Sequence, residues 1–262
     1  MSGLLNIVHS GDMGDIIAGL GAIRDVCELN DAKARIFLDT TGGTNDKWCL
    51  KQSQGKGLKF NQKSFEFLRP LIEEQPYVAD CNDLQVVQPL NVDIDMNVFR
   101  SLFFNKDMVE QTNTNLLFTQ QVVCGVEMGY KRPWLTVPNE GKHRKVAVAR
   151  SNRYHSSDAL YLVNADEIES DGVFIGTELE HKAFKDCTRI EVPQLFVKDA
   201  LALAQAIQNS DKFIVNGTLA YWIAVGLGHP NIWHEIGVDI PTTYFPNQTP
   251  SINYVMGNRK VN

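Results

Sequence analysis

The amino end of the chain places a glycine-rich loop between an apolar segment and a helical pattern, and a second apolar segment follows. Residues 4–10 and 34–39 are apolar with β-branched members, which is typical of buried strands, whereas residues 14–29 carry apolar side chains at helical spacing. Strands joined through a helix run parallel, so this segment predicts a βαβ unit in a parallel sheet. Ligands of such sheets bind beyond the carboxyl ends of the strands, where the loop after the first strand lies.

The alternation of strand and helix patterns restarts in the second half of the chain. Residues 130–145 are rich in proline, glycine and charge, which predicts two α/β domains facing each other, at 1–138 and 139–262. In the first domain we also expect a helix over 65–81 interrupted near Pro70, a strand over 84–90 and a helix over 113–129. In the second, the patterns predict strands over 145–151, 171–176, 188–193, 212–217 and 231–236, and helices over 177–186, 197–210 and 218–228.

Charge and composition exclude several classes of protein. The formal net charge is -6, which argues against a broad basic surface for nucleic-acid phosphates. No apolar run reaches membrane-spanning length and no secretory leader is apparent, so we expect a cytoplasmic protein. The 5 cysteines form no CxxC pair and the 6 histidines lack ligand spacing, so the sequence predicts reduced thiols and no histidine metal site.

The loop after the first strand is unusual for a nucleotide site. It contains Gly11, Asp12, Gly14 and Asp15 without the Gly-x-Gly-x-x-Gly pattern of dinucleotide enzymes. Two carboxylates at a helix start would also repel a pyrophosphate, at a cost of roughly 1 kcal/mol each, so we do not expect phosphate here. Either acid is a candidate helix cap, and Asp15 is alternatively a general base at the strand-to-helix turn.

The phosphate site is expected in the second half, where a strand ends and a helix begins at Asn216, Gly217 and Thr218. The glycine lets a ligand approach the backbone, the threonine offers a hydroxyl, and the N–H groups of the next helical turn form an anion site without net charge. Arg150 and Arg153 follow the first strand of this half, where they either chelate phosphate oxygens or belong to a solvated loop.

Further contacts to a nucleotide or sugar are expected from neighbouring loops of this half. Glu180 and His181 lie one turn into the helix after Gly176, where they meet a ribose or sugar hydroxyl or are simply solvated. Glu235 ends a strand and is either a hydrogen-bond acceptor for a ribose or a satisfied strand-end acid. Tyr154 is expected to pack beside the arginine-bearing loop.

Two rival signals point to other chemistry. Asp39, at the end of the second predicted strand, is the acid that an NAD-linked oxidoreductase would need for a ribose, although the glycine pattern is missing. Asp93 and Asp95 have the D-x-D spacing that can hold a divalent cation against a diphosphate. We favour a surface position for this pair, because no nucleotide-binding pattern adjoins it.

Two stretches resemble the heptosyltransferase-like glycosyltransferases. Residues 9–26 are similar to the strand, loop and helix that open the acceptor domain of that family, and residues 210–233 are similar to its donor segment. The resemblance implies two facing Rossmann-like domains (GT-B), a nucleotide-sugar donor held mainly by the carboxyl-terminal one, and no essential metal. It makes Asp15 the candidate base, and it assigns the remaining loop residues as follows: Ser10, Gly11, Asp12 and Gly14 to the acceptor side, and Asn216, Gly217 and Thr218 to the donor.

The resemblance has departures that keep other functions open. Tyr221 and Trp222 stand where the family often has a histidine, and no basic residue has a secure match beyond Arg150 or Arg153. Our first hypothesis is a metal-independent glycosyltransferase whose acceptor hydroxyl belongs to a carbohydrate or, in a bacteriophage enzyme, to a hydroxymethylated DNA base. The alternatives are a non-catalytic nucleotide- or sugar-binding module of the same fold and an NAD-linked oxidoreductase.

Overall fold

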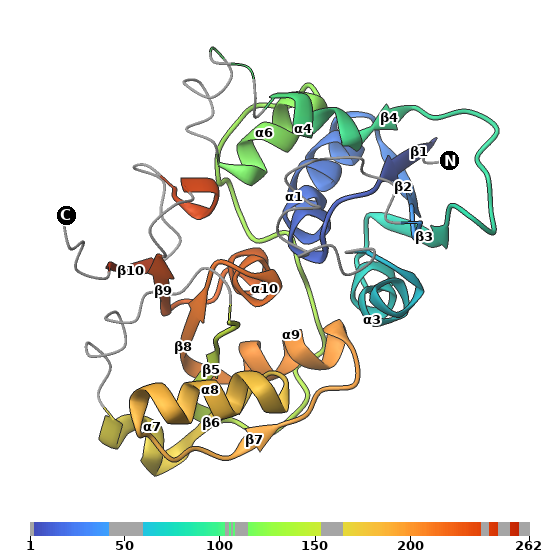
Figure 1. Ribbon diagram of the computed structural model, residues 1–262. Helices are drawn as coiled ribbons and strands as arrows, with labels where there is room; N and C mark the ends of the chain where they lie inside the picture. Colours follow the sequence, from blue (N-terminus) through green and yellow to red (C-terminus); the bar gives the residue numbers. More distant parts are fainter. Residues whose placement is uncertain are drawn as a thin grey trace. The chain divides into compact units, whose positions relative to one another are not determined.

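The structure is a computed structural model that describes residues 3–41, 60–102, 105, 107, 115–152, 165–236, 241–245 and 252–256. It divides into two units, Met1–Gly129 and Tyr130–Asn262, each with its own parallel sheet (Figure 1). The predicted boundary lies a few residues further on, after Pro138. The segment between is joined to the second unit, since the N–H groups of Trp134 and Leu135 both donate to the carbonyl of Gly226, at 2.8 and 2.9 Å.

The first unit is a four-stranded sheet of order β3-β2-β1-β4 whose strands all run parallel. The strands are β1 (Gly3–His9), β2 (Ala32–Leu38), β3 (Val78–Asp83) and β4 (Ile94–Asp95). The helices are α1 (Met13–Leu29), α3 (Gln62–Glu73), η1 (Met96–Val98), α4 (Phe99–Leu102) and α6 (Leu116–Val123). The predicted βαβ unit is β1-α1-β2, and the apolar side chains at helical spacing in α1 form its core, since Ile16, Ile17, Leu20 and Ile23 are at most 1% exposed.

The second unit is a six-stranded parallel sheet of order β10-β9-β8-β5-β6-β7. The strands are β5 (Arg144–Ala149), β6 (Gly172–Ile175), β7 (Gln194–Leu195), β8 (Ser210–Asn216), β9 (Ile232–Ile236) and β10 (Ile252–Met256). The helices are α7 (Ala165–Asp171), α8 (Glu178–Thr188), α9 (Ala200–Gln208), α10 (Leu219–Leu227) and η3 (Pro241–Thr243). The doubled α/β arrangement predicted from the sequence is therefore present.

Some predicted elements are wrong. No strand forms over 84–90: residues 84–86 form a turn, in which the N–H groups of Val86 and Val87 both donate to the carbonyl of Asp83, and the following residues are irregular. The helix expected over 65–81 ends at Glu73, and β3 follows it. Pro70 does not interrupt this helix: its four buried apolar side chains, each worth about 1.5–3 kcal/mol, outweigh a cost of about 3 kcal/mol for an interior proline. The strand expected over 188–193 is replaced by β7, which begins just after it.

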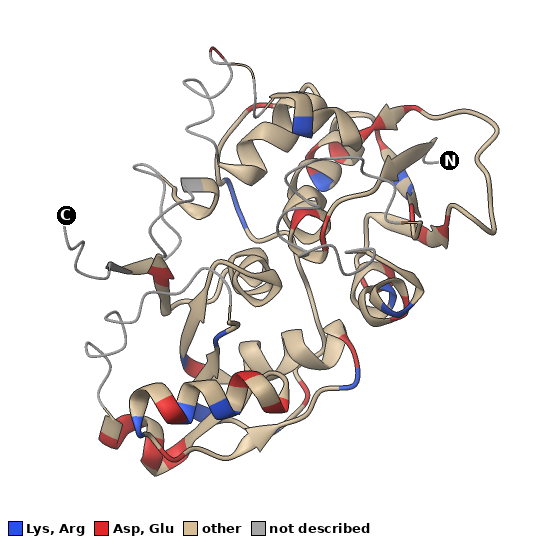
Figure 2. Cartoon of the chain, in the orientation of Figure 1, with Lys and Arg blue, Asp and Glu red and all other residues tan. Residues whose placement is uncertain are grey.

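The charged residues of the second unit are unevenly distributed. Figure 2 shows acidic residues concentrated on α7 and α8, whereas α10 and the loop before it, residues 216–218, contain no charged residue. Within the described ranges, no helix combines the length and the apolarity needed to cross a membrane.

Candidate functional site

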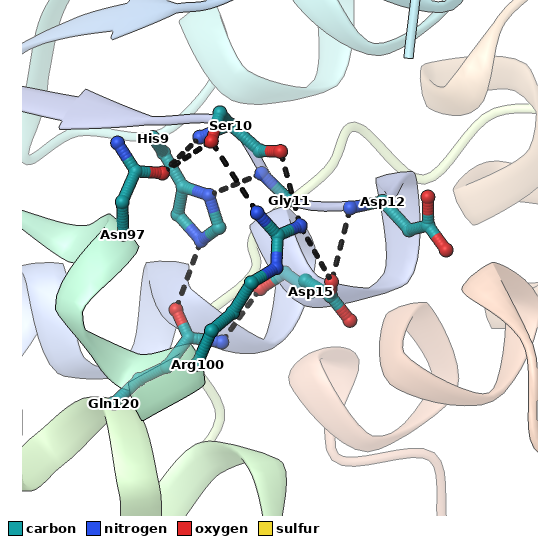
Figure 3. A network of polar contacts seen from close by, with 8 residues as sticks. All are labelled: His9, Ser10, Gly11, Asp12, Asp15, Asn97, Arg100 and Gln120. Atoms are coloured by element: carbon teal, nitrogen blue, oxygen red, sulfur yellow. Dashed lines mark hydrogen bonds and ion pairs between the residues drawn. The ribbon is translucent and has the colours of Figure 1, made fainter. Parts of the chain in front are cut away.

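The loop between β1 and α1 presents a carboxylate at the carboxyl edge of the first sheet (Figure 3). Asp12 is the N-cap residue of α1, and its backbone N–H donates to Oδ2 of Asp15 at 3.0 Å. The carboxylate of Asp15 thus caps the helix, as one of the two predicted alternatives requires. Its side chain is nevertheless 26% exposed, so a cap role does not exclude contact with a ligand. Gly11 is required here, because a Cβ would lie 2.5 Å from Cε1 of His9 and 2.6 Å from Cβ of Asp15.

A buried chain of hydrogen bonds connects the two ends of this loop. The N–H of Gly11 donates to Nδ1 of His9 at 2.9 Å, so the imidazole proton resides on Nε2 and is donated to Oε1 of Gln120 at 3.0 Å. Nε2 of Gln120 then donates to the carbonyl of Asp15 at 2.8 Å. Burial, above all, lowers the pKa of His9 to about 4, so this histidine is neutral at pH 7 and shapes the loop.

The neutral state of His9 predicts how stability depends on pH. Unfolded His9 takes up a proton near pH 6.5 and folded His9 only near pH 4, so between these values the unfolded chain binds more protons and the free energy of unfolding falls as the pH falls. At about 1.36 kcal/mol per pH unit, the loss between pH 6.5 and pH 4 comes to about 3 kcal/mol. Urea unfolding at pH 7 and pH 5 measures the upper part of this window, where we expect a loss of about 2 kcal/mol. A His9→Gln variant should show a shallower dependence, and an equal slope in both proteins would contradict the assignment.

Three further side chains that sequence reasoning missed hold the loop in place. Asn97 Oδ1 accepts from both the N–H of Ser10, at 2.7 Å, and its hydroxyl, at 2.5 Å. Nη2 of Arg100 donates to the carbonyl of Ser10 at 3.1 Å and lies 3.8 Å from Oδ2 of Asp15. The third is Gln120. A glycine inside helix α1, Gly19, is the feature of the sequence that could have indicated it, because a Cβ at Gly19 would collide with Oε1 of Gln120.

The second unit places its predicted donor loop at the carboxyl end of β8. Asn216 is fully buried, and its amide both accepts from the N–H of Ser151 at 3.1 Å and donates to the Ser151 carbonyl at 3.0 Å. The side chain therefore ties β8 to the chain that leaves β5. Thr218 is the N-cap of α10, whose first-turn N–H groups have no acceptor within the helix. A Cβ at Gly217 would make ordinary contacts, the nearest at 3.4 Å to Thr243, so packing alone does not require glycine there.

Arg150 and Glu235 are both at this edge of the sheet, and they pair with each other. Nε of Arg150 lies 2.7 Å from Oε2 of Glu235, Nη2 lies 3.1 Å from Oε1, and each side chain is only 4% exposed. Because β8 lies between β5 and β9, this bidentate pair spans the strand that ends at Asn216. Their predicted contacts with phosphate and ribose stay predictions, while the described geometry gives them a structural role.

The residues predicted after β6 have local partners. Oε2 of Glu180 accepts from the N–H and the hydroxyl of Thr177, both at 2.8 Å, which is the capping box of α8. Nε2 of His181 donates to the carbonyl of Val192 at 2.8 Å, and its ring stacks on Phe174. Gly176 avoids a clash, since a Cβ would lie 2.8 Å from Cε1 of that phenylalanine. Arg153 and Tyr154 lie outside the described residues.

Tyr221 and Trp222, which stand where the resembled family often has a histidine, belong to the buried core. Tyr221 is fully buried, its ring lies 4.1 Å from the ring of His234, and its hydroxyl donates to the carbonyl of Thr243 at 2.5 Å. The hydroxyl of Thr243 in turn donates to Nε2 of His234 at 2.8 Å. Burial lowers the pKa of His234 to about 4 and raises that of Tyr221. This packed group also supports the predicted donor loop, because Thr243 and His234 are the side chains nearest to Gly217.

The rival motifs have local structural roles. Oδ2 of Asp93 accepts from the N–H of Asn6 at 2.7 Å, and Oδ1 of Asp95 accepts from the N–H of Asn97 at the start of η1. Asp39 accepts from the N–H of Thr41 at 2.9 Å. In the part of the chain that the structure describes, no three His, Cys, Asp or Glu residues are grouped to hold a metal ion.

The fold has counterparts among solved structures. No protein-family model and no curated protein sequence matches the chain. A glycosyl transferase of family 9 from Veillonella parvula aligns with a TM-score of 0.58 and 10% identity over 97% of this chain and 86% of that one. The E. coli ADP-heptose LPS heptosyltransferase II gives 0.55 and 12% over 97% and 90%. The fold is that of these glycosyltransferases.

A third counterpart was solved in complex with a nucleotide sugar. TibC, from enterotoxigenic E. coli, is described as a dodecameric iron-containing heptosyltransferase and was solved with ADP-D-beta-D-heptose. It aligns with a TM-score of 0.55 and 12% identity, over 96% of this chain and 63% of TibC. At these identities the likeness concerns the fold, and the chemistry depends on the residues of this chain.

Proposed function

We propose that this protein is a glycosyltransferase that moves a sugar from a nucleotide-activated donor to an acceptor hydroxyl. The observation that carries the proposal is that one chain with this fold has both a partly exposed carboxylate after β1 and an uncharged helix start after β8. An acid at a strand-to-helix turn suits proton transfer, and an amide-rich helix start suits a diphosphate. The likeness to nucleotide-sugar enzymes supports this reading of both loops.

In the proposed reaction, Asp15 accepts the proton of the acceptor hydroxyl as its oxygen bonds to the anomeric carbon of the sugar. The bond from that carbon to the diphosphate oxygen breaks, and negative charge builds on the leaving diphosphate. The first-turn N–H groups of α10 and the hydroxyl of Thr218 would stabilise this charge more in the transition state than in the ground state. Gly217, which packing does not require, would let the phosphate approach the backbone.

The proposal includes no metal ion in the transfer step. The charge on the diphosphate would be met by helix N–H groups and, as predicted from the sequence, by Arg153. The acceptor is a hydroxyl of a carbohydrate or of a hydroxymethylated DNA base. A DNA acceptor would need a local basic surface, and the sequence offers a cluster of five lysines over residues 47–63. Four of them, Lys47, Lys51, Lys56 and Lys59, lie outside the described residues.

The test is release of nucleoside diphosphate from a panel of UDP-, GDP- and ADP-sugars, with and without acceptor. We expect one donor to give release that depends on an oligosaccharide or on hydroxymethylated DNA and that survives EDTA. Loss of release in EDTA would contradict metal independence alone. Donor binding without release under every condition would favour the binding module, and binding of NAD instead of any nucleotide sugar would favour the oxidoreductase.

A further inference from the structure

Arg100 is a charged side chain that faces Asp15 from a distant part of the sequence. It belongs to α4, which follows β4 and η1 in the chain, and β4 is paired with β1. Phe99 beside it is 2% exposed and anchors the helix. The Arg100 guanidinium lies over the Phe99 ring, 5.3 Å from its centroid. Its side chain is 16% exposed, so the charge is largely held within the loop network (Figure 3).

The contacts of Arg100 act on one side of the Asp15 carboxylate. Oδ2 of Asp15 receives the N–H of Asp12 at 3.0 Å and faces Nη2 of Arg100 at 3.8 Å. The other carboxylate oxygen is turned away from both donors (Figure 3). The same guanidinium holds the carbonyl of Ser10 at 3.1 Å and its hydroxyl oxygen at 3.4 Å, so it also fixes the start of the loop.

We infer that Arg100 is the positioning residue of the proton-transfer step: it holds Oδ2 of Asp15 so that Oδ1 takes the proton of the acceptor hydroxyl. The inference rests on the proposed function. A carboxylate with both oxygens free to rotate would spend less time aligned with the acceptor, and misalignment of a reacting group by about 1 Å can cost about 10²-fold in rate. Arg100 itself does not contact the reacting atoms in this scheme.

A double-mutant cycle distinguishes positioning from general support of the fold. Arg100→Met should lower kcat by about 10²-fold and leave the donor Kd within about twofold, and Arg100→Lys should recover part of the loss because it retains the charge. In an Asp15→Asn background, the same Arg100→Met change should have little further effect. Arg35→Met is the matched control, an arginine of the same unit that pairs with Asp80, and it should leave transfer unchanged.

The outcomes separate the inference from the function on which it rests. If the unsubstituted chain transfers no sugar, the proposed function fails. If it transfers sugar and Arg100→Met costs the same factor with or without the Asp15 carboxylate, only the inference fails. A crystal structure of the Arg100→Lys variant and of the Arg100→Met variant gives a second readout: we expect the Met variant alone to show the carboxylate displaced from the Asp12 amide. An unmoved carboxylate would overturn the inference.

Discussion

If the protein is the proposed glycosyltransferase, we expect the replacement of Asp15 by Asn to lower the rate of sugar transfer by about 10²–10⁴-fold, the range typical of a lost general base. The substitution is sterically conservative, since an amide oxygen can still accept the N–H of Asp12, which Asp15 Oδ2 accepts at 3.0 Å. The fold and the cap of α1 should therefore survive. Donor affinity should stay within about twofold, because the proposed diphosphate site lies in the second unit, at the start of α10. Single-turnover rates and donor titration measure the two quantities separately.

The matched control is Asp31→Asn, which makes the same charge change in the same unit. Asp31 is exposed and lies in the turn before β2, at the amino ends of the strands. Asp15 lies at the other end of the sheet, where the strands reach their carboxyl ends. Its φ of 47° is one that asparagine tolerates well, so stability should be unchanged. Transfer should then match that of the unsubstituted protein. An Asp15→Asn protein with full turnover would remove Asp15 as the base and leave it only its role at the start of α1.

The fold could be predicted where short-range patterns decide it. The helical spacing over residues 14–29 and the flanking apolar segments specify β1-α1-β2, because one face of α1 must be buried against a sheet. The prediction of a strand over 84–90 was wrong because apolar residues alone do not show whether a segment pairs with a neighbouring strand. Val86 is 77% exposed and lies in a turn. β4, with two residues, is too short to give a pattern, although it sets the edge of the first sheet.

The candidate site was predictable only in part. The sequence places Asp15 and Thr218 correctly at the starts of helices, because each strand-loop-helix pattern involves only residues that are close together in the chain. Arg100 and Gln120 were missed because their contacts with the first loop depend on how distant segments pack. In the same way, the pairing of Arg150 with Glu235 depends on the order of strands in the sheet, which the sequence pattern does not give.

That buried pair leads to the largest expected loss of stability. Changing Glu235 to Gln takes away the carboxylate that pairs with a guanidinium only 4% exposed, and breaking such a pair typically costs about 3–5 kcal/mol. Urea unfolding of the second unit measures the loss. Asp186→Asn is the matched control, because its pair with Lys182 is exposed, at 62% and 75%, and should contribute little to stability. A loss at Glu235 no larger than that at Asp186 would contradict the structural role of the pair.

Replacing both partners separates that structural role from a role in donor binding. Buried ion pairs exchanged for apolar residues of similar volume are often neutral in stability, so Arg150→Met with Glu235→Leu should recover most of what Glu235→Gln loses. If Arg150 only braces the carboxyl ends of β5 and β9, the double variant binds the donor as well as the unsubstituted protein. If the guanidinium also contacts the diphosphate, stability returns but donor affinity does not. The comparison therefore decides whether the predicted phosphate contact of Arg150 exists, independently of any measurement of turnover.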